Sequence, residues 1–137
     1  MSFDPYIHFR GNCREAMAAY RTIFGGTLNL MGYAEAPDAT EEMKTSDLVM
    51  HCTLTAGGRM LMGSDFPPGF AGDPQQAVTI SHTAPSDAEA RRIFAALAEG
   101  GAVIMDYQPT FWSDGFGMLK DRFGTHWMVS APWRQQG

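Results

Sequence analysis

The sequence is short of charge. Only 18% of its 137 residues are charged and 45% are hydrophobic, a composition typical of a folded domain rather than of a disordered chain. Ten Lys and Arg residues stand against fifteen Asp and Glu, for a net charge of −5. A protein that binds the phosphate backbone needs clustered basic residues. We therefore expect no nucleic-acid partner.

Long apolar runs and cysteine are also scarce. The apolar run Ile93 to Ala98 is far too short to span a bilayer, and Met1 to Pro5 carries neither the basic start nor the apolar stretch of a secretory signal. We therefore expect a cytoplasmic protein with no membrane partner. The two cysteines, Cys13 and Cys52, lie far apart with no CxxC spacing, so we expect two buried free thiols.

The chain contains an internal repeat, with an offset of roughly 75 residues. Asn12-Cys13-Arg14-Glu15 and Ser86-Asp87-Ala88-Glu89 each have the pattern of a capping box that begins a helix. Apolar residues follow each box at helical spacing. Each helix is predicted to end at a glycine pair, Gly25-Gly26 or Gly100-Gly101.

Strands are predicted on both sides of each helix. They cover residues 6–9, 27–31, 49–55 and 60–63 in the first half, and residues 78–83, 102–107, 116–120 and 125–130 in the second. Glycine-containing turns join the last two strands of each half into a hairpin. The predicted fold is α+β. It is a single domain of two βαβββ modules, about residues 1–64 and 76–137, joined by a linker at residues 65–75.

One helix covers one face of each predicted sheet, so we expect the other face to curve into a trough. Strand alternation decides which side chains face the trough. The trough side is predicted to hold Tyr6, His8, Val49, His51, Thr53, Thr55, Thr79, Ser81, His126, Met128 and Ser130. The core side is predicted to hold Ile7, Phe9, Met50, Cys52, Leu54, Val78, Ile80, Trp127 and Val129. A slip of one residue would reverse each assignment.

Several motifs of this chain are shared with a known family. They are Pro5-Tyr6-Ile7-His8-Phe9-Arg10-Gly11-Asn12-Cys13, Thr110-Phe111-Trp112, Gly115-Phe116-Gly117, Asp121-Arg122-Phe123-Gly124 and Trp127-Met128. The set resembles PhnB-like proteins of the glyoxalase/bleomycin resistance/dioxygenase (vicinal oxygen chelate) superfamily. The resemblance covers essentially the whole chain and implies paired βαβββ modules and a homodimer. Members also carry the label 3-demethylubiquinone methyltransferase-like, but the strand-to-helix turns here lack the glycine-rich pattern of common S-adenosylmethionine sites.

The resemblance also implies where a metal would bind. The superfamily commonly holds a divalent ion with one ligand from the first and last strand of each module. Those positions fall here on Asp4 or Pro5, Met62, Thr79 and Met128. Thioether and hydroxyl groups are poor ligands for such ions. We therefore expect no metal and no other cofactor, which argues against glyoxalase-type catalysis.

Two functions stay open on the sequence alone. The first is the binding of a small, partly apolar molecule of unknown identity in a metal-free trough. The alternative is a metal-dependent lyase or dioxygenase-type enzyme with relocated ligands, in which His51 or His8 acts as base or ligand. The sequence assigns no catalytic residue. The pocket candidates are Tyr6, His8, His51, Met62, Thr79, Trp112, Phe116, His126 and Met128.

Other residues that invite a functional interpretation are expected to be structural. Asp65, just after the fourth strand, is interpreted as a turn former rather than a pocket carboxylate. His82 and Cys52 have the alternation of core residues. Loop aromatics either wall a ligand pocket or pack against a second subunit. They are Phe66, Phe70, Phe111, Trp112 and Phe116.

Overall fold

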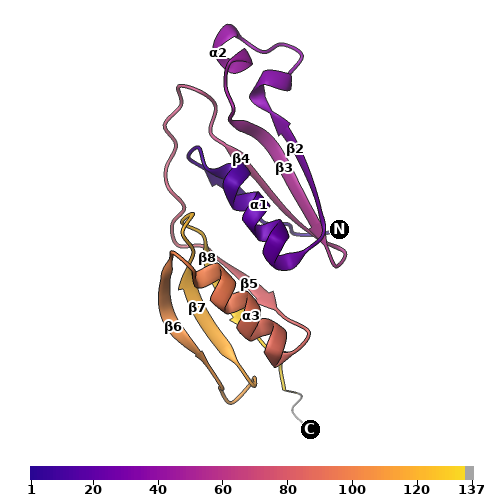
Figure 1. Cartoon of the computed structure of the whole chain (residues 1–137), viewed down its shortest axis with the longest axis vertical. Helices are drawn as coiled ribbons and strands as arrows, with labels where there is room; N and C mark the ends of the chain where they lie inside the picture. Colours follow the sequence, from indigo (N-terminus) through magenta and orange to yellow (C-terminus); the bar gives the residue numbers. More distant parts are fainter. Residues whose placement is uncertain (135–137) are drawn as a thin grey trace. The chain divides into compact units, whose positions relative to one another are not determined.

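The computed structural model describes residues 1–134 (Figure 1). The chain divides into two compact units, residues 1–75 and 76–137. Each unit is a four-stranded mixed sheet with one long helix, so the fold is α+β with two βαβββ modules, as the repeat predicts. The role of residues 65–75 as a linker within one domain stays a prediction. Within residues 1–134 no helix has the length and apolar character needed to cross a membrane.

Unit 1 contains the first four strands. Its elements are β1 (Tyr6–Phe9), α1 (Cys13–Phe24), β2 (Thr27–Gly32), η1 (Tyr33–Glu35), α2 (Glu41–Lys44), β3 (Val49–Ala56) and β4 (Arg59–Asp65). The sheet order is β1-β4-β3-β2, with β1 parallel to β4 and the other pairs antiparallel. The short helices η1 and α2 lie in a stretch that the sequence does not assign to any element.

Unit 2 repeats this connectivity. Its elements are β5 (Thr79–Thr83), α3 (Asp87–Ala98), β6 (Ala102–Gln108), β7 (Phe116–Lys120) and β8 (His126–Ser130). The sheet order is β5-β8-β7-β6, and β5 is parallel to β8. Figure 1 shows one long helix lying along one side of each sheet, α1 in unit 1 and α3 in unit 2. The predicted repeat is therefore confirmed element by element.

The start of α3 follows the sequence, because the Ser86 hydroxyl accepts a hydrogen bond from the Glu89 backbone N–H at 3.1 Å. The ends of both helices also follow it. Gly25 has φ of +78° and Gly100 has φ of +75°, the left-handed conformation in which glycine ends a helix at little cost.

The start of α1 does not follow the sequence. The Asn12 side chain makes no capping bond, so the capping box predicted there is wrong. The carboxylate of Asp65, from the end of β4, takes its place and accepts from the backbone N–H groups of Gly11 at 2.9 Å and Cys13 at 3.0 Å. It also accepts from Val49 N–H at 2.9 Å. Asp65 is 2% exposed, and its interpretation as a turn former is wrong.

Gly63 marks the side of the unit 1 sheet that α1 covers. A Cβ added at Gly63 would lie 3.1 Å from the Phe9 ring and 3.5 Å from the sulfur of Cys13, the first residue of α1. Gly63 pairs with Ile7 and Cys52, and both of those side chains are buried. Side chains in register with Gly63 therefore face the helix, and the alternate ones face away.

The predicted alternation fails at the start of β3. Met31 pairs with His51 and Gly32 pairs with Val49, so Met50 is the extra residue of a β-bulge. Val49, predicted in the trough, is instead fully buried, and Met50, predicted in the core, is half-buried. The bulge shifts the alternation by one residue, which is the slip that reverses such assignments.

Gly117 marks the covered side of the unit 2 sheet, since an added Cβ would lie 2.6 Å from the Phe94 ring of α3. Its partner Val129 is buried, as is Trp127 on the same side. Val78, predicted in the core, lies before the first residue of β5 and is 73% exposed. That prediction is wrong because the strand begins one residue later than its apolar pattern indicates.

Candidate functional site

The side of the unit 1 sheet that faces away from α1, here called open face 1, carries three exposed residues of the predicted site. Tyr6 and His8 lie on β1, and His51 lies on β3. All three are exposed, whereas Ile7 and Cys52, their neighbours in sequence, are buried. Alternation along the strands therefore places these residues on one surface, as predicted.

The sheet order brings these three side chains into contact. The Tyr6 hydroxyl lies 3.1 Å from His51 Nδ1, and the two rings stack with centroids 5.7 Å apart. The rings of Tyr6 and His8 are 5.0 Å apart. His8 in turn stacks on Phe66 at 5.5 Å with an interplanar angle of 18°. We call His51, Tyr6, His8 and Phe66 the aromatic row.

In both imidazoles Nδ1 is in contact with a hydroxyl group, which leaves Nε2 for a ligand. When the Tyr6 hydroxyl donates to His51 Nδ1, the ring proton of neutral His51 is on Nε2, which is then a donor. The Ser64 hydroxyl lies 3.5 Å from His8 Nδ1, so the same reasoning holds for His8. The aromatic row thus combines flat apolar faces with polar nitrogen atoms, a combination that suits a planar molecule with a few polar groups.

Open face 1 also carries Met62 and Ser64 beside the aromatic row. Met62 pairs with Tyr6 and with Thr53 in the sheet and is half-buried. Ser64 and Phe66 contact His8 but are absent from the predicted site. Their spacing is the signal that could have found them, because residues 62, 64 and 66 alternate onto the same face as Met62.

The matching side of unit 2, open face 2, carries three more of the predicted site residues, Thr79, His126 and Met128. Thr79 pairs with His126, and Met128 pairs with Ser81 on β5 and Met118 on β7. Thr79 is exposed, and His126 and Met128 are half-buried. His126 Nδ1 is buried and has no hydrogen-bond partner within the described residues.

Trp112 is the centre of a second aromatic group. Its ring lies 4.8 Å from Phe111, 5.5 Å from Phe116 and 6.3 Å from Trp133. Its Nε1 is buried and lacks a hydrogen-bond partner among residues 1–134. Phe111 and Trp133 are 84% and 64% exposed. The structure therefore brings Trp112 and Phe116 into contact at the start of β7.

The residues at the expected metal positions do not fit a divalent ion. The Asp4 carboxylate is exposed and accepts a hydrogen bond from Ser2. Met62 offers a thioether and Thr79 a hydroxyl, both weak ligands for such ions. The sheet register sets His126, rather than Met128, opposite Thr79, but one imidazole does not make a site. Across residues 1–134 no three His, Cys, Asp or Glu side chains gather closely enough to hold a metal.

The two cysteines are free and buried, as predicted. The Cys13 thiol donates a hydrogen bond to the Cys52 sulfur, and this bond together with burial raises the pKa of Cys13 well above its ordinary value. A thiol that stays protonated is a poor nucleophile. The same bond lowers the pKa of Cys52, against the effect of burial, but both side chains are fully buried. The contact therefore belongs to the core beneath α1.

Comparison with known proteins finds relatives over nearly the whole length of the chain. The family described as 3-demethylubiquinone-9 3-methyltransferase matches residues 1–130. Protein YjdN of Escherichia coli strain K12 is 32% identical over 142 residues, which cover 96% of this chain and 95% of that protein. Among solved structures, protein PA1353 from Pseudomonas aeruginosa has a TM-score of 0.87 at 42% identity, covering 96% of this chain and 97% of that one.

More distant structures share the fold alone. The PhnB protein from Bacillus cereus has a TM-score of 0.73 at 24% identity, covering 96% of this chain and all (100%) of that one. A glyoxalase/bleomycin resistance protein/dioxygenase family enzyme from Burkholderia phytofirmans PsJN also has this arrangement, with a TM-score of 0.61 at 12% identity. So does the fosfomycin resistance protein FosX from Mesorhizobium loti, with a TM-score of 0.57 at 9% identity. These similarities assign the fold only. What the protein binds has to be inferred from the residues of the two open faces.

Proposed function

Because this chain belongs to the 3-demethylubiquinone-9 3-methyltransferase family, PhnB-like proteins with the glyoxalase/bleomycin resistance fold, we propose a function from its side chains and not from the family's name. The protein binds a small, partly apolar molecule on the aromatic row of open face 1, without a bound metal. The observation that carries this proposal is the contact between the Tyr6 hydroxyl and His51 Nδ1 within a continuous exposed row of rings.

Methyl transfer is not part of the proposal. A common S-adenosylmethionine site has a glycine-rich turn between a strand and a helix. The corresponding turns here are Arg10-Gly11-Asn12 and Ala84-Pro85-Ser86, which contain one glycine between them. The single Gly11 has its N–H bonded to Asp65, so this turn offers no glycine-rich cradle for a cofactor.

The aromatic row supplies two kinds of interaction. Stacking on an exposed ring contributes about 0.5–1.5 kcal/mol beyond area burial, and a hydrogen bond to a neutral imidazole contributes about 1 kcal/mol. Tyr6 and His51 are already held in place by each other, so binding requires less ordering of these two side chains. A flat molecule with one or two carbonyl or hydroxyl oxygens fits this surface best.

The proposal is tested by a ligand screen on purified protein and matched variants. Thermal shift and NMR would be used against small diketones, phosphonates and aromatic antibiotics. Tyr6→Phe and His51→Gln should weaken each hit about fivefold or more, since each removes one hydrogen bond of about 1 kcal/mol. Thr55→Val, at the far end of β3, is the control and should leave binding unchanged. A uniformly negative screen, or hits insensitive to both row variants, would contradict the proposal.

The metal-free part has a separate test. Elemental analysis and native mass spectrometry on untagged, unchelated protein should find no stoichiometric transition metal. Near-stoichiometric zinc, nickel, manganese or iron that disappears in His51→Ala or His8→Ala would instead favour the enzyme with relocated ligands.

The second candidate function, an enzyme of the glyoxalase or dioxygenase type, is favoured by the same contact. A phenol hydrogen-bonded to an imidazole can move a proton to and from a bound substrate. Turnover of any hit from the screen that is lost in His51→Gln while binding persists would support this function. Turnover that persists in this variant would count against it.

We also propose that two copies of the chain associate. Support comes from the exposed aromatic rings of Phe111 and Trp133, since aromatic side chains are enriched at subunit interfaces. Sedimentation equilibrium should report a dimer, and a monomer at high micromolar concentration would contradict this proposal.

A further inference from the structure

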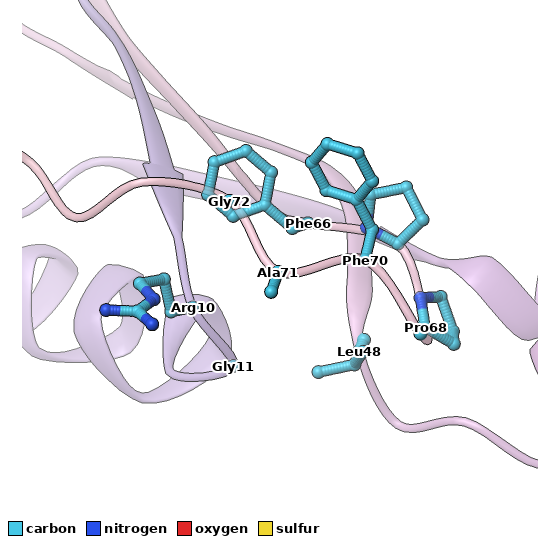
Figure 2. A pocket seen from close by; sticks show the side chains of 10 residues that line it. Arg10, Gly11, Leu48, Phe66, Pro68, Phe70, Ala71 and Gly72 are labelled. Atoms are coloured by element: carbon cyan, nitrogen blue, oxygen red, sulfur yellow. The ribbon is translucent and has the colours of Figure 1, made fainter.

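A pocket of about 250 Å³ lies at one end of the unit 1 sheet, where β1 and β4 end and β3 begins. Figure 2 shows the long Arg10 side chain at one edge of it and Leu48 and Pro68 at another, with Ala71 between them. Segment 66–72 forms most of its wall. The pocket lies beside the aromatic row and shares Phe66 with it.

The apolar wall of the pocket is held in place. Phe66 packs on Phe70 with ring centroids 5.7 Å apart, and its backbone N–H bonds to the Phe9 carbonyl at 3.0 Å. Gly72 lies directly against the Phe66 ring, where an added Cβ would overlap the ring atoms. The close approach of Gly72 thus fixes one position for Phe66 and closes the wall.

The buried Asp65 holds the backbone on two sides of the pocket. Its carboxylate binds the N–H of Gly11, next to Arg10, and the N–H of Val49, next to Leu48. Three backbone donors therefore satisfy the Asp65 charge. The Arg10 guanidinium is not needed to neutralise it.

Arg10 is consequently available to a ligand. Within residues 1–134 it makes no ion pair or hydrogen bond, whereas Arg91, Arg92 and Arg134 each pair with a carboxylate. A guanidinium binds a carboxylate through two parallel hydrogen bonds. One arginine in a chain of net charge −5 suits a single negative charge better than a dianion.

We propose that this pocket binds a small carboxylic acid, with the carboxylate on Arg10 and a compact apolar body against Phe66, Phe70 and Leu48. The volume lies below the roughly 300–1,000 Å³ of sites for drug-sized ligands, which restricts the body to about the size of one ring. The inference does not rest on the proposed function, because the polar groups of Tyr6 and His51 take no part in it.

Benzoate is the probe, and benzamide is its uncharged match of the same shape. Backbone amide NMR is suitable because glycine signals lie in a distinct region and the pocket contains Gly11, Gly69 and Gly72. Benzoate should shift these three signals with a Kd of about 1 mM, as expected for a ligand of so few atoms. The signals of Gly57 and Gly58, in the β3–β4 turn, should stay unchanged.

Charge removal gives the first discriminating comparison. Arg10→Gln should weaken benzoate binding about tenfold, which corresponds to about 1.4 kcal/mol. Arg59→Gln removes the same charge at the opposite end of β4 and should leave the Kd within about twofold. Benzamide should bind about tenfold more weakly than benzoate to the unaltered protein. Equal effects of the two arginine variants, or equal binding of the two probes, would overturn the inference.

Shape gives the second comparison. Gly72→Ala keeps Arg10 but displaces the Phe66 ring, and it should abolish the shifts of the other two pocket glycines while the rest of the spectrum shows a folded protein. Benzoate binding that is lost in His51→Gln but kept in Arg10→Gln would place the probe on the aromatic row and overturn this inference alone. Loss in Arg10→Gln with normal binding in His51→Gln supports the inference even if no ligand of the aromatic row is found.

Discussion

Replacing Asp65 should destabilise unit 1 more than the loss of any exposed carboxylate. The side chain is 2% exposed. Its Oδ1 accepts from Gly11 and Cys13 at the start of α1, and its Oδ2 accepts from Val49 at the start of β3. One carboxylate at the end of β4 thus joins two segments that are distant in sequence.

The magnitude follows from counting donors. In Asp65→Asn the amide oxygen can still accept the N–H groups of Gly11 and Cys13, but the new NH₂ group faces the N–H of Val49, which is buried. Losing a charge-assisted hydrogen bond and leaving a buried donor without a partner overlap in energy and together cost about 3 kcal/mol. In Asp65→Ala all three donors are unsatisfied, and about 5 kcal/mol is expected. The free energy of unfolding of a small domain is only about 5–15 kcal/mol. Asp65→Asn, the milder of the two changes, is therefore the variant to measure first.

Urea unfolding monitored by circular dichroism gives the free energy of unfolding, with the slope m as a check on two-state behaviour. Asp73→Asn is the matched control, because Asp73 is exposed and follows in the next segment. The control should change stability by less than about 0.5 kcal/mol. An Asp65→Asn protein as stable as this control would refute the reasoning, because the three bonds would then contribute nothing measurable.

The two helix starts should respond differently when the polar side chain before the helix is removed. In urea unfolding, Ser86→Ala should lower the free energy of unfolding by about 1 kcal/mol, whereas Asn12→Ala should change it very little. Equal losses in the two variants would contradict this. Gly26→Ala should destabilise the protein more than Gly25→Ala, because both have positive φ but only at Gly26 does an added Cβ collide with a backbone carbonyl of β3; thermal unfolding of both variants decides it. Burial lowers the pKa of His82 below its ordinary 6.5, so the unfolded chain binds the proton more tightly and stability should fall as pH drops through and below 6.5. His82→Asn should make that fall shallower in urea titrations, and an unchanged slope would contradict the assignment.

The sequence predicts the repeated fold well because its signals are local. An apolar stripe of helical period, a glycine pair at each helix end and glycine turns between alternating strands all lie within a few residues of the feature they specify. Ser86 is of this kind, since its bond partner Glu89 is one helical turn away. Agreement of the two halves adds a check that a single module would lack.

The predictions that fail depend on contacts between different segments of the chain. Asp65 replaces Asn12 at the start of α1 from a strand that begins 35 residues after the helix ends, and no local pattern marks such a contact. The bulge at Met50 depends on how β2 pairs with β3, which alternation within β3 does not contain. A cap can be recognised from four residues, but the partner of a buried carboxylate requires the tertiary structure.

The candidate site depends both on local signals and on contacts between distant segments. Alternation alone places Tyr6, His8 and His51 on one face. Their contact, however, requires the sheet order, because β4 lies between β1 and β3 and Met62 separates Tyr6 from Thr53 in the register. Phe66 was expected only as a loop aromatic, because it follows the last residue of β4. The alternation of residues 62 and 64 has to be continued one step past the strand to place it on this face.

The hydrogen-bond partners of the row also limit what its imidazoles can bind. Tyr6 engages His51 Nδ1 and Ser64 engages His8 Nδ1, so each ring presents Nε2 to a ligand. Within the described residues no group of three His, Cys, Asp or Glu side chains could hold a metal. Two imidazole nitrogens alone make a weak site for a divalent ion, which needs three or four such ligands. The same two nitrogens, one hydrogen bond each, suit an organic molecule with two neighbouring oxygens. Tyr6→Phe removes the hydroxyl and frees His51 Nδ1. The variant should therefore bind an organic ligand more weakly, while its affinity for zinc should be no lower than that of the unaltered protein.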